Sequence, residues 1–179
     1  MYSTRMQSVT MKIFLFSILM ITFNSSYAVD LNTPKEIDGW FANEIISKKD
    51  LDERVKSYLK GKPELRNPGR LHLDINGDGK KDVVILTKKS DEEVVKIRIF
   101  ICNKTCTEKL SKDIGSVGDT FLSLVNRGSI VEESESLPGA VNVIKLKTSS
   151  VKVINFGKSE IIFYWDPATN SILSLTIGD

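Results

Sequence analysis

The chain has 179 residues, of which 41% are hydrophobic and 27% are charged, and its formal net charge is +2. This length is enough for one domain with a sizeable hydrophobic core. Basic and acidic residues are nearly equal in number and interspersed, which excludes the strongly basic surface typical of a nucleic-acid-binding protein.

The N-terminal segment has the order of features found in a secretory signal peptide. Lys12 precedes the apolar run Ile13–Phe23, and Ala28 ends a stretch with small residues at the two positions that signal peptidase inspects. We expect translation to start at Met11 and cleavage to remove residues 1–28. The apolar run has eleven residues, fewer than the roughly 20 that a transmembrane helix needs. An uncleaved N-terminal anchor is the alternative.

The remaining part, residues 29–179, is then a single exported domain located in the periplasm or outside the cell. Residues 1–28 hold two basic residues and no acidic one, which leaves 23 of each sign and no net charge. No second long apolar stretch follows. We therefore expect no transmembrane segment after signal cleavage and no nucleic acid among the partners.

One helix is predicted near the start of the exported domain. Residues 29–43 form a mixed lead-in with a turn at Asp38-Gly39, and a helical pattern extends over residues 42–59. A capping-box pattern occurs at Ser47–Asp50, and apolar residues then recur at helical spacing. Gly61 and then Pro63 end the helix in the expected order.

From Arg70 onward the pattern is that of short β-strands separated by turn residues. Val95, Ile97 and Ile99, for example, alternate with polar or charged residues. Consecutive hairpins predict an antiparallel meander, and one helix packed on it gives an α+β fold that is mostly β. The eight predicted strands are Arg70–Asp74, Asp82–Lys88, Val94–Ile101, Thr120–Val125, Val141–Lys147, Val151–Phe156, Glu160–Trp165 and Ser171–Ile177.

The chain has two cysteines, Cys102 and Cys106, and both lie in the exported part. In an oxidising compartment a nearby pair predicts a disulfide. The three residues between them have turn composition, which brings the two cysteines within bridging reach. A redox pair and a zinc half-site are the alternatives, but redox pairs usually have two intervening residues and zinc needs further ligands.

The most informative motif is the loop from Asp74 to Asp82. Oxygen-bearing side chains stand at relative positions 1, 3, 5 and 9, and glycines at positions 4 and 6 permit a sharp turn. Such a loop wraps around a hard cation, and calcium, which accepts six to eight oxygens, is the natural occupant. The predicted ligands are the side chains of Asp74, Asn76, Asp78 and Asp82 and the carbonyl of Lys80.

The loop has two alternative interpretations. An EF-hand needs a bidentate carboxylate at relative position 12, which is Ile85 here, so the helix–loop–helix form is excluded. Asn-Gly and Asp-Gly are also preferred dipeptides of tight β-turns, so the loop could keep the turn without the metal.

The loop resembles that of FG-GAP and VCBS-type repeats, in which a DxDxDGxxD motif binds calcium between two β-strands. The chain is also similar to small exported bacterial proteins of unknown function. These combine a single loop of this kind with a Y-W-D hairpin, here Tyr164-Trp165-Asp166, and a C-terminal G-D, here Gly178-Asp179. The resemblance covers roughly Leu71–Asp179, and it implies that the calcium is structural.

No catalytic constellation is visible. His72 is the only histidine, and no Ser-His-Asp set can be assembled. Trp165 is expected to cover the core, with a contact to a carbohydrate or a partner as the alternative. We predict a non-enzymatic domain that binds a protein or an envelope component. A periplasmic immunity or inhibitor protein against a secreted toxin is the alternative, and a hydrolase with unrecognised carboxylates is a third reading.

Overall fold

A computed structural model describes residues 33–88, 92–132 and 143–177. The predicted signal peptide, residues 1–28, and the C-terminal Gly178-Asp179 lie outside the described residues, as does part of the predicted strand Val141–Lys147.

The first half of the β-region forms a four-stranded antiparallel sheet, here called sheet A. Its strands follow one another in space as they do in the chain, β1-β2-β3-β4, and three of them were predicted from the sequence. Sheet A consists of β1 (Arg70–Leu73), β2 (Asp82–Thr87), β3 (Val94–Cys102) and β4 (Cys106–Ser116).

The second half forms sheet B, a four-stranded antiparallel sheet with the order β10-β9-β8-β5. A separate two-stranded pair, β6 and β7, lies between β5 and β8 in the chain. The strands are β5 (Thr120–Val125), β6 (Ile130–Glu132), β7 (Val143–Lys145), β8 (Ser150–Asn155), β9 (Ser159–Asp166) and β10 (Ser171–Thr176). The predicted α+β fold with antiparallel meanders is confirmed.

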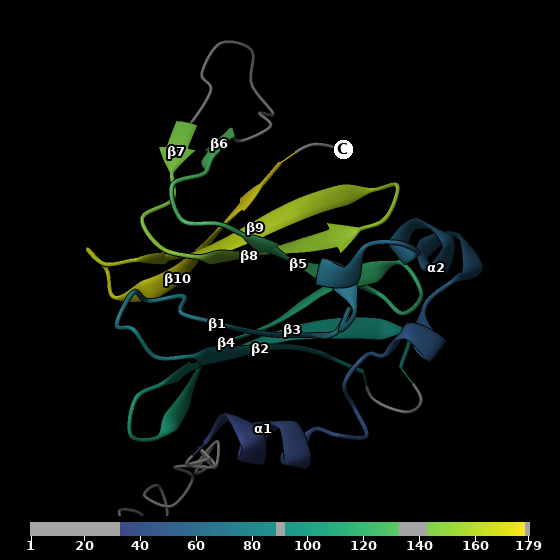
Figure 1. The fold of residues 1–179 in the computed structure, drawn as a ribbon, viewed down its shortest axis with the longest axis horizontal. Helices are drawn as coiled ribbons and strands as arrows, with labels where there is room; N and C mark the ends of the chain where they lie inside the picture. The colour runs from purple at the N-terminus through teal and green to yellow at the C-terminus, as the bar shows by residue number, and fades with distance from the viewer. Residues whose placement is uncertain (1–32, 89–91, 133–142, 178–179) are drawn as a thin grey trace, which may run out of the picture.

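The two sheets stack face to face, and α1 lies on the outer face of sheet A (Figure 1). Strand β2 is buried along its whole length because it is covered on both sides. Its residues Val84 and Leu86 face sheet B and join the main core with Phe121 and Val153. Val83 and Ile85 belong to a second, smaller apolar cluster under α1. Covering both faces explains why β2 has no polar alternation.

The predicted helix over residues 42–59 is confirmed only in its last seven residues, and residues 42–52 are not α-helical. The structure instead has two short helices, α1 (Pro34–Trp40) and α2 (Glu53–Leu59), with 3-10 turns at Lys48–Asp50 and Pro63–Leu65. The predicted capping box at Ser47 is present, but it caps only the first of these turns.

Tertiary hydrogen bonds explain why the longer helix does not form. The Ile46 amide donates to the Leu86 carbonyl at 2.9 Å, and the Lys88 amide donates to the Glu44 carbonyl at 2.9 Å. Ile45 therefore forms an isolated antiparallel bridge with Thr87 at the end of β2, and the chain cannot be helical at this point. At Pro34 a capping box between Thr33 and Glu36 starts α1 where only a lead-in was expected.

Strand β4 was not predicted. Exposed charged and polar side chains stand at successive positions in residues 107–109 and 111–113, without the alternation that identifies a half-buried strand. It is an edge strand held by its ladder with β3, and two register irregularities interrupt that ladder. The short strand β6 was missed as well.

Candidate functional site

The loop Asp74–Asp82 connects β1 to β2, the strand buried on both faces. Gly77 and Gly79 have φ angles of +82° and +84°, in the left-handed region that favours glycine. The two glycines that were predicted to permit a sharp turn are thus the residues at which the loop turns. All five predicted ligand residues lie in this one segment.

The Asp74 carboxylate forms the centre around which the loop winds. Its Oδ1 accepts hydrogen bonds from the amides of Gly77 at 2.7 Å and Asp78 at 3.0 Å. Its Oδ2 accepts a third from the amide of Gly79 at 2.9 Å. These bonds hold the loop in a tight turn in which several backbone amides point at one carboxylate.

The side chains of the next two predicted ligands each accept a hydrogen bond from the backbone amide two residues further along the chain. Asn76 Oδ1 accepts a hydrogen bond from the Asp78 amide at 3.1 Å, and Asp78 Oδ1 accepts one from the Lys80 amide at 2.8 Å. The Lys80 side chain reaches across to the turn between β3 and β4, where its Nζ donates to Asn103 Oδ1.

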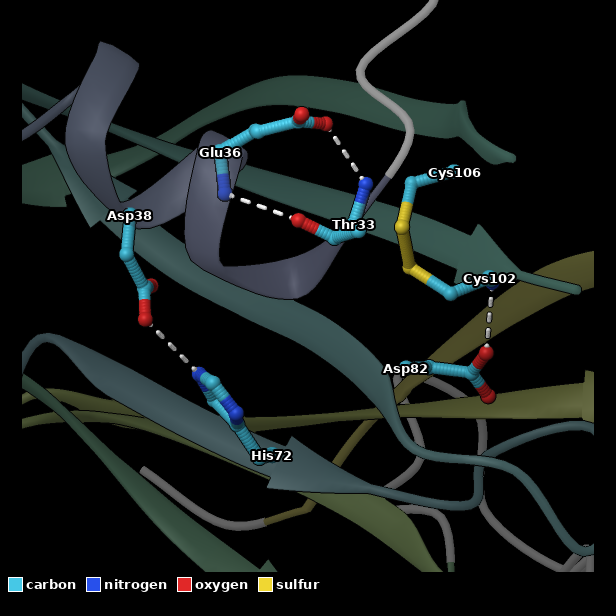
Figure 2. The surroundings of a disulfide bond; sticks show 7 residues. All are labelled: Thr33, Glu36, Asp38, His72, Asp82, Cys102 and Cys106. Atoms are coloured by element: carbon cyan, nitrogen blue, oxygen red, sulfur yellow. Dashed lines mark hydrogen bonds and ion pairs between the residues drawn. A yellow bond between two sulfur atoms is a disulfide. The ribbon is translucent and has the colours of Figure 1, made fainter. Parts of the chain in front are cut away.

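Asp82 is fully buried, at 0% exposure, at the base of the loop. Its Oδ2 accepts a hydrogen bond from the Ile75 amide at 2.9 Å, and its Oδ1 accepts one from the Cys102 amide at 2.8 Å (Figure 2). Burial raises the pKa of Asp82, the hydrogen bonds from Cys102 and Ile75 oppose this, and the Asp78 carboxylate raises the pKa further.

The donor set has the chemistry that Ca²⁺ requires, because three carboxylates and one amide oxygen occur within nine residues. A carboxylate offers about four lone-pair sites, and the bonds from backbone amides leave at least one free on each of Asp74, Asp78 and Asp82. Within residues 33–88, 92–132 and 143–177, however, no three His, Cys, Asp or Glu side chains are grouped as a metal site. In this structure the carboxylates of the loop accept hydrogen bonds from backbone amides instead.

Cys102 and Cys106 form a disulfide, as predicted, and it closes the hairpin between β3 and β4. The two residues stand opposite each other in the β3–β4 register. Both are buried, and they pack with Ile37 and Phe41 in the smaller apolar cluster under α1. The disulfide therefore lies between the candidate loop and the helix that covers sheet A.

Sequence reasoning missed a polar network between α1 and β1. Asp38 Oδ2 lies 2.8 Å from Arg70 Nη1 and 3.3 Å from His72 Nε2, a contact that Figure 2 shows. His72 thus pairs with a carboxylate that no local sequence pattern connects to it. Two cavities of about 580 Å³ each share Asp38, Arg70, Arg66 and Asn67 in their walls.

Charged and polar side chains contribute to the walls of both cavities. Ser47 contributes the one hydroxyl side chain among their described lining residues, and its Oγ donates to Asp50 Oδ2 at 2.6 Å. It is therefore engaged in the capping box rather than directed toward His72.

The Y-W-D segment has a structural explanation. Trp165 is 9% exposed and belongs to the buried residues, in agreement with its expected place in the core. Asp166 accepts hydrogen bonds from the Ala168 and Thr169 amides and from Thr169 Oγ1. The bond from the Thr169 side chain is the main cause that lowers the pKa of Asp166. Asp166 thus closes the β9–β10 turn.

A comparison of the chain with protein-family models, curated proteins and solved structures finds no match. In the part of the chain that the structure describes, no helix is long and apolar enough to cross a membrane.

Proposed function

We propose that this protein is an exported, non-enzymatic domain that one structural Ca²⁺ stabilises, and that it acts by binding another protein or an envelope component. The observation that carries the proposal is the position of the Asp74–Asp82 loop. The loop joins an edge strand to β2, and β2 contributes to both apolar clusters.

The predicted ion would be held by Asp74, Asn76, Asp78 and Asp82, with the Lys80 carbonyl as a further ligand. Its chemistry is electrostatic: it would offset the repulsion between the Asp78 and Asp82 carboxylates. Ca²⁺ suits the loop better than Mg²⁺, because Mg²⁺ demands near-ideal octahedral geometry and retains several of its waters.

An ion that binds only the folded loop stabilises the whole domain by mass action. Loops of extracellular modules bind calcium at roughly 0.1–1 mM. At about 10 mM calcium the stabilisation would be about 1.4–2.7 kcal/mol, which corresponds to a rise in melting temperature of about 3–10 °C for a domain of this size.

The test is thermal unfolding of the purified protein in 10 mM calcium and in excess chelator. We expect the calcium-dependent rise of about 3–10 °C in the native protein and its loss in Asp78→Ala. The matched control is Asp113→Ala, which removes one exposed carboxylate of β4 far along the chain from the loop. It should keep the full calcium response.

Identical melting temperatures in calcium and chelator would contradict the structural-ion part of this proposal. The loop would then be a metal-free turn held by its own amides.

The binding role is supported by the polar cavities between α1 and β1, whose walls include the cations Arg66 and Lys48. Affinity capture of envelope extracts with the native protein, and with Arg66→Gln as the matched variant, tests this part. A one-to-one complex with a secreted toxin would identify the partner class as that of an immunity protein. Equal recovery by both proteins would place the binding surface elsewhere.

A further inference from the structure

Two contacts join the candidate loop to the turn that the disulfide closes. Asp82 Oδ1 accepts a hydrogen bond from the Cys102 amide at 2.8 Å, and Lys80 Nζ donates one to Asn103 Oδ1. The other carboxylate oxygen of Asp82 accepts a hydrogen bond from the Ile75 amide. One buried carboxylate therefore bridges the second residue of the loop and the last residue of β3.

The register of sheet A shows why this bridge exists. The β2–β3 ladder ends at the pair Val83 and Phe100, so the Cys102 amide has no partner residue on β2. The Asp82 side chain accepts a hydrogen bond from that amide in place of a backbone carbonyl of β2. On the other side, Cys102 stands opposite Cys106, and the Asn103 amide donates to the Thr105 carbonyl across the short turn.

We propose that the Cys102–Cys106 disulfide is a positioning element of the loop, on the basis of the function proposed above. By closing the turn it fixes the Cys102 amide, which orients the Asp82 carboxylate, and it fixes Asn103, which keeps the Lys80 ammonium away from the loop carboxylates. Opening the disulfide loosens both contacts, and the loop loses order and cation affinity together.

The chemistry of opening is ordinary thiol–disulfide exchange with a dithiol reductant. The S–S bond breaks, each cysteine sulfur gains one hydrogen, and the dithiol is oxidised to its own disulfide. Because both cysteines are buried, the thiol form is prepared by unfolding, reduction and refolding under reductant. A Cys102→Ser/Cys106→Ser double variant provides the same comparison without reductant.

The first measurement is amide hydrogen exchange at Ile75 and Cys102, which needs no metal. We expect exchange at both amides to be at least about 10-fold faster in the thiol form and in the double variant, because the charged acceptor is no longer held in place. Val153→Ala is the matched control, since it weakens the core cluster to which Ile75 also belongs but leaves the disulfide intact. It should leave exchange at Ile75 unchanged relative to neighbouring amides.

The second measurement is calcium binding by calorimetry to the disulfide and thiol forms. We expect affinity about 10-fold weaker in the thiol form, the factor that loss of one charge-assisted hydrogen bond produces. Equal exchange rates in the two forms, or equal calcium affinities where calcium binds, would overturn the proposal. If neither form binds calcium, the proposed ion fails, while faster exchange in the thiol form still supports the positioning role.

Discussion

Asp50 illustrates how single side chains tie distant segments together. Its carboxylate accepts hydrogen bonds from the Ser47 amide at 2.8 Å, from Ser47 Oγ at 2.6 Å and from Lys88 Nζ at 2.7 Å. Burial acts to raise the pKa of Asp50, but the hydrogen bonds from Lys88 and Ser47 outweigh it, and the pKa falls from 3.8 to about 2. The contact joins the first 3-10 turn to the residue that follows β2.

This lowered pKa predicts a pH dependence of stability. The folded protein holds the Asp50 proton less tightly than the unfolded chain, so the stabilisation is present above pH 4 and is lost as the pH falls to about 2. After allowance for solvent screening the loss is about 1 kcal/mol. Urea unfolding of the native protein and Asp50→Asn should show stabilities that converge between pH 4 and 2.

Lys88→Met checks the cause, because it removes the principal hydrogen-bond donor and should reduce that convergence. Parallel pH curves for the native protein and Asp50→Asn would contradict the prediction.

Gly69 marks a place where backbones approach closely. A Cβ built there would lie 2.1 Å from the Ile46 carbonyl oxygen, which belongs to backbone and cannot rotate away. Gly69→Ala is therefore expected to destabilise the fold by about 2–3 kcal/mol, measured by urea unfolding. Gly39→Ala is the control: it lies within α1 with no atom within 4 Å of the added Cβ, and it should stabilise by up to about 1 kcal/mol. Equal effects of the two substitutions would contradict this reading.

At the scale of elements, α1 depends on packing more than on its own length. It has seven residues, too few for a stable isolated helix, and Ile37 is the residue that it buries completely. With Phe41, Ile37 covers the outer face of sheet A and the disulfide. The helix and this face therefore protect each other from water.

Ile37→Ala should lower the free energy of unfolding by about 2–4 kcal/mol, since it opens a cavity between α1 and β2. Trp40→Ala is the matched control on the same helix, because Trp40 is 63% exposed and its loss should cost less than about 0.5 kcal/mol. Urea unfolding of both variants measures the difference. A similar loss in both would mean that α1 contributes little to the core.

The elements also show which local patterns are informative. Strands such as β3 were predictable because alternating apolar residues face the core directly. Of the helix predicted over residues 42–59 only α2 forms, since backbone hydrogen bonds from Ile46 and Lys88 to distant carbonyl groups outweigh local helical spacing in the part before it. Strand β4 was not predicted because most of its side chains are exposed at the edge of the sheet and show no alternating apolar pattern.

For the whole molecule, both sheets share one core. Val84 from sheet A and Val153 from sheet B belong to the same buried cluster, which also includes Val55 and Leu59 of α2. Neither sheet can lose its partner without exposing this surface to water. The described sandwich is therefore expected to unfold as one cooperative unit.

Calorimetry tests this expectation. Val84→Ala and Val153→Ala should each lower the temperature of one and the same transition, with calorimetric and van't Hoff enthalpies in agreement. Two separate transitions, with each substitution moving only one of them, would show that the sheets unfold independently.

The amino-acid sequence by itself determined the features that depend on neighbours along the chain. These are the antiparallel hairpins, the loop Asp74–Asp82 with its glycines at the turning points, and the disulfide across a short turn. Only the tertiary structure decided which polar groups meet from different elements. The Asp82 contact with Cys102 and the Asp38 contact with His72 arise where strands and a helix pack together. Such pairs cannot be recognised from a periodic pattern in the sequence, because their geometry depends on sheet register and on how the layers pack rather than on local spacing.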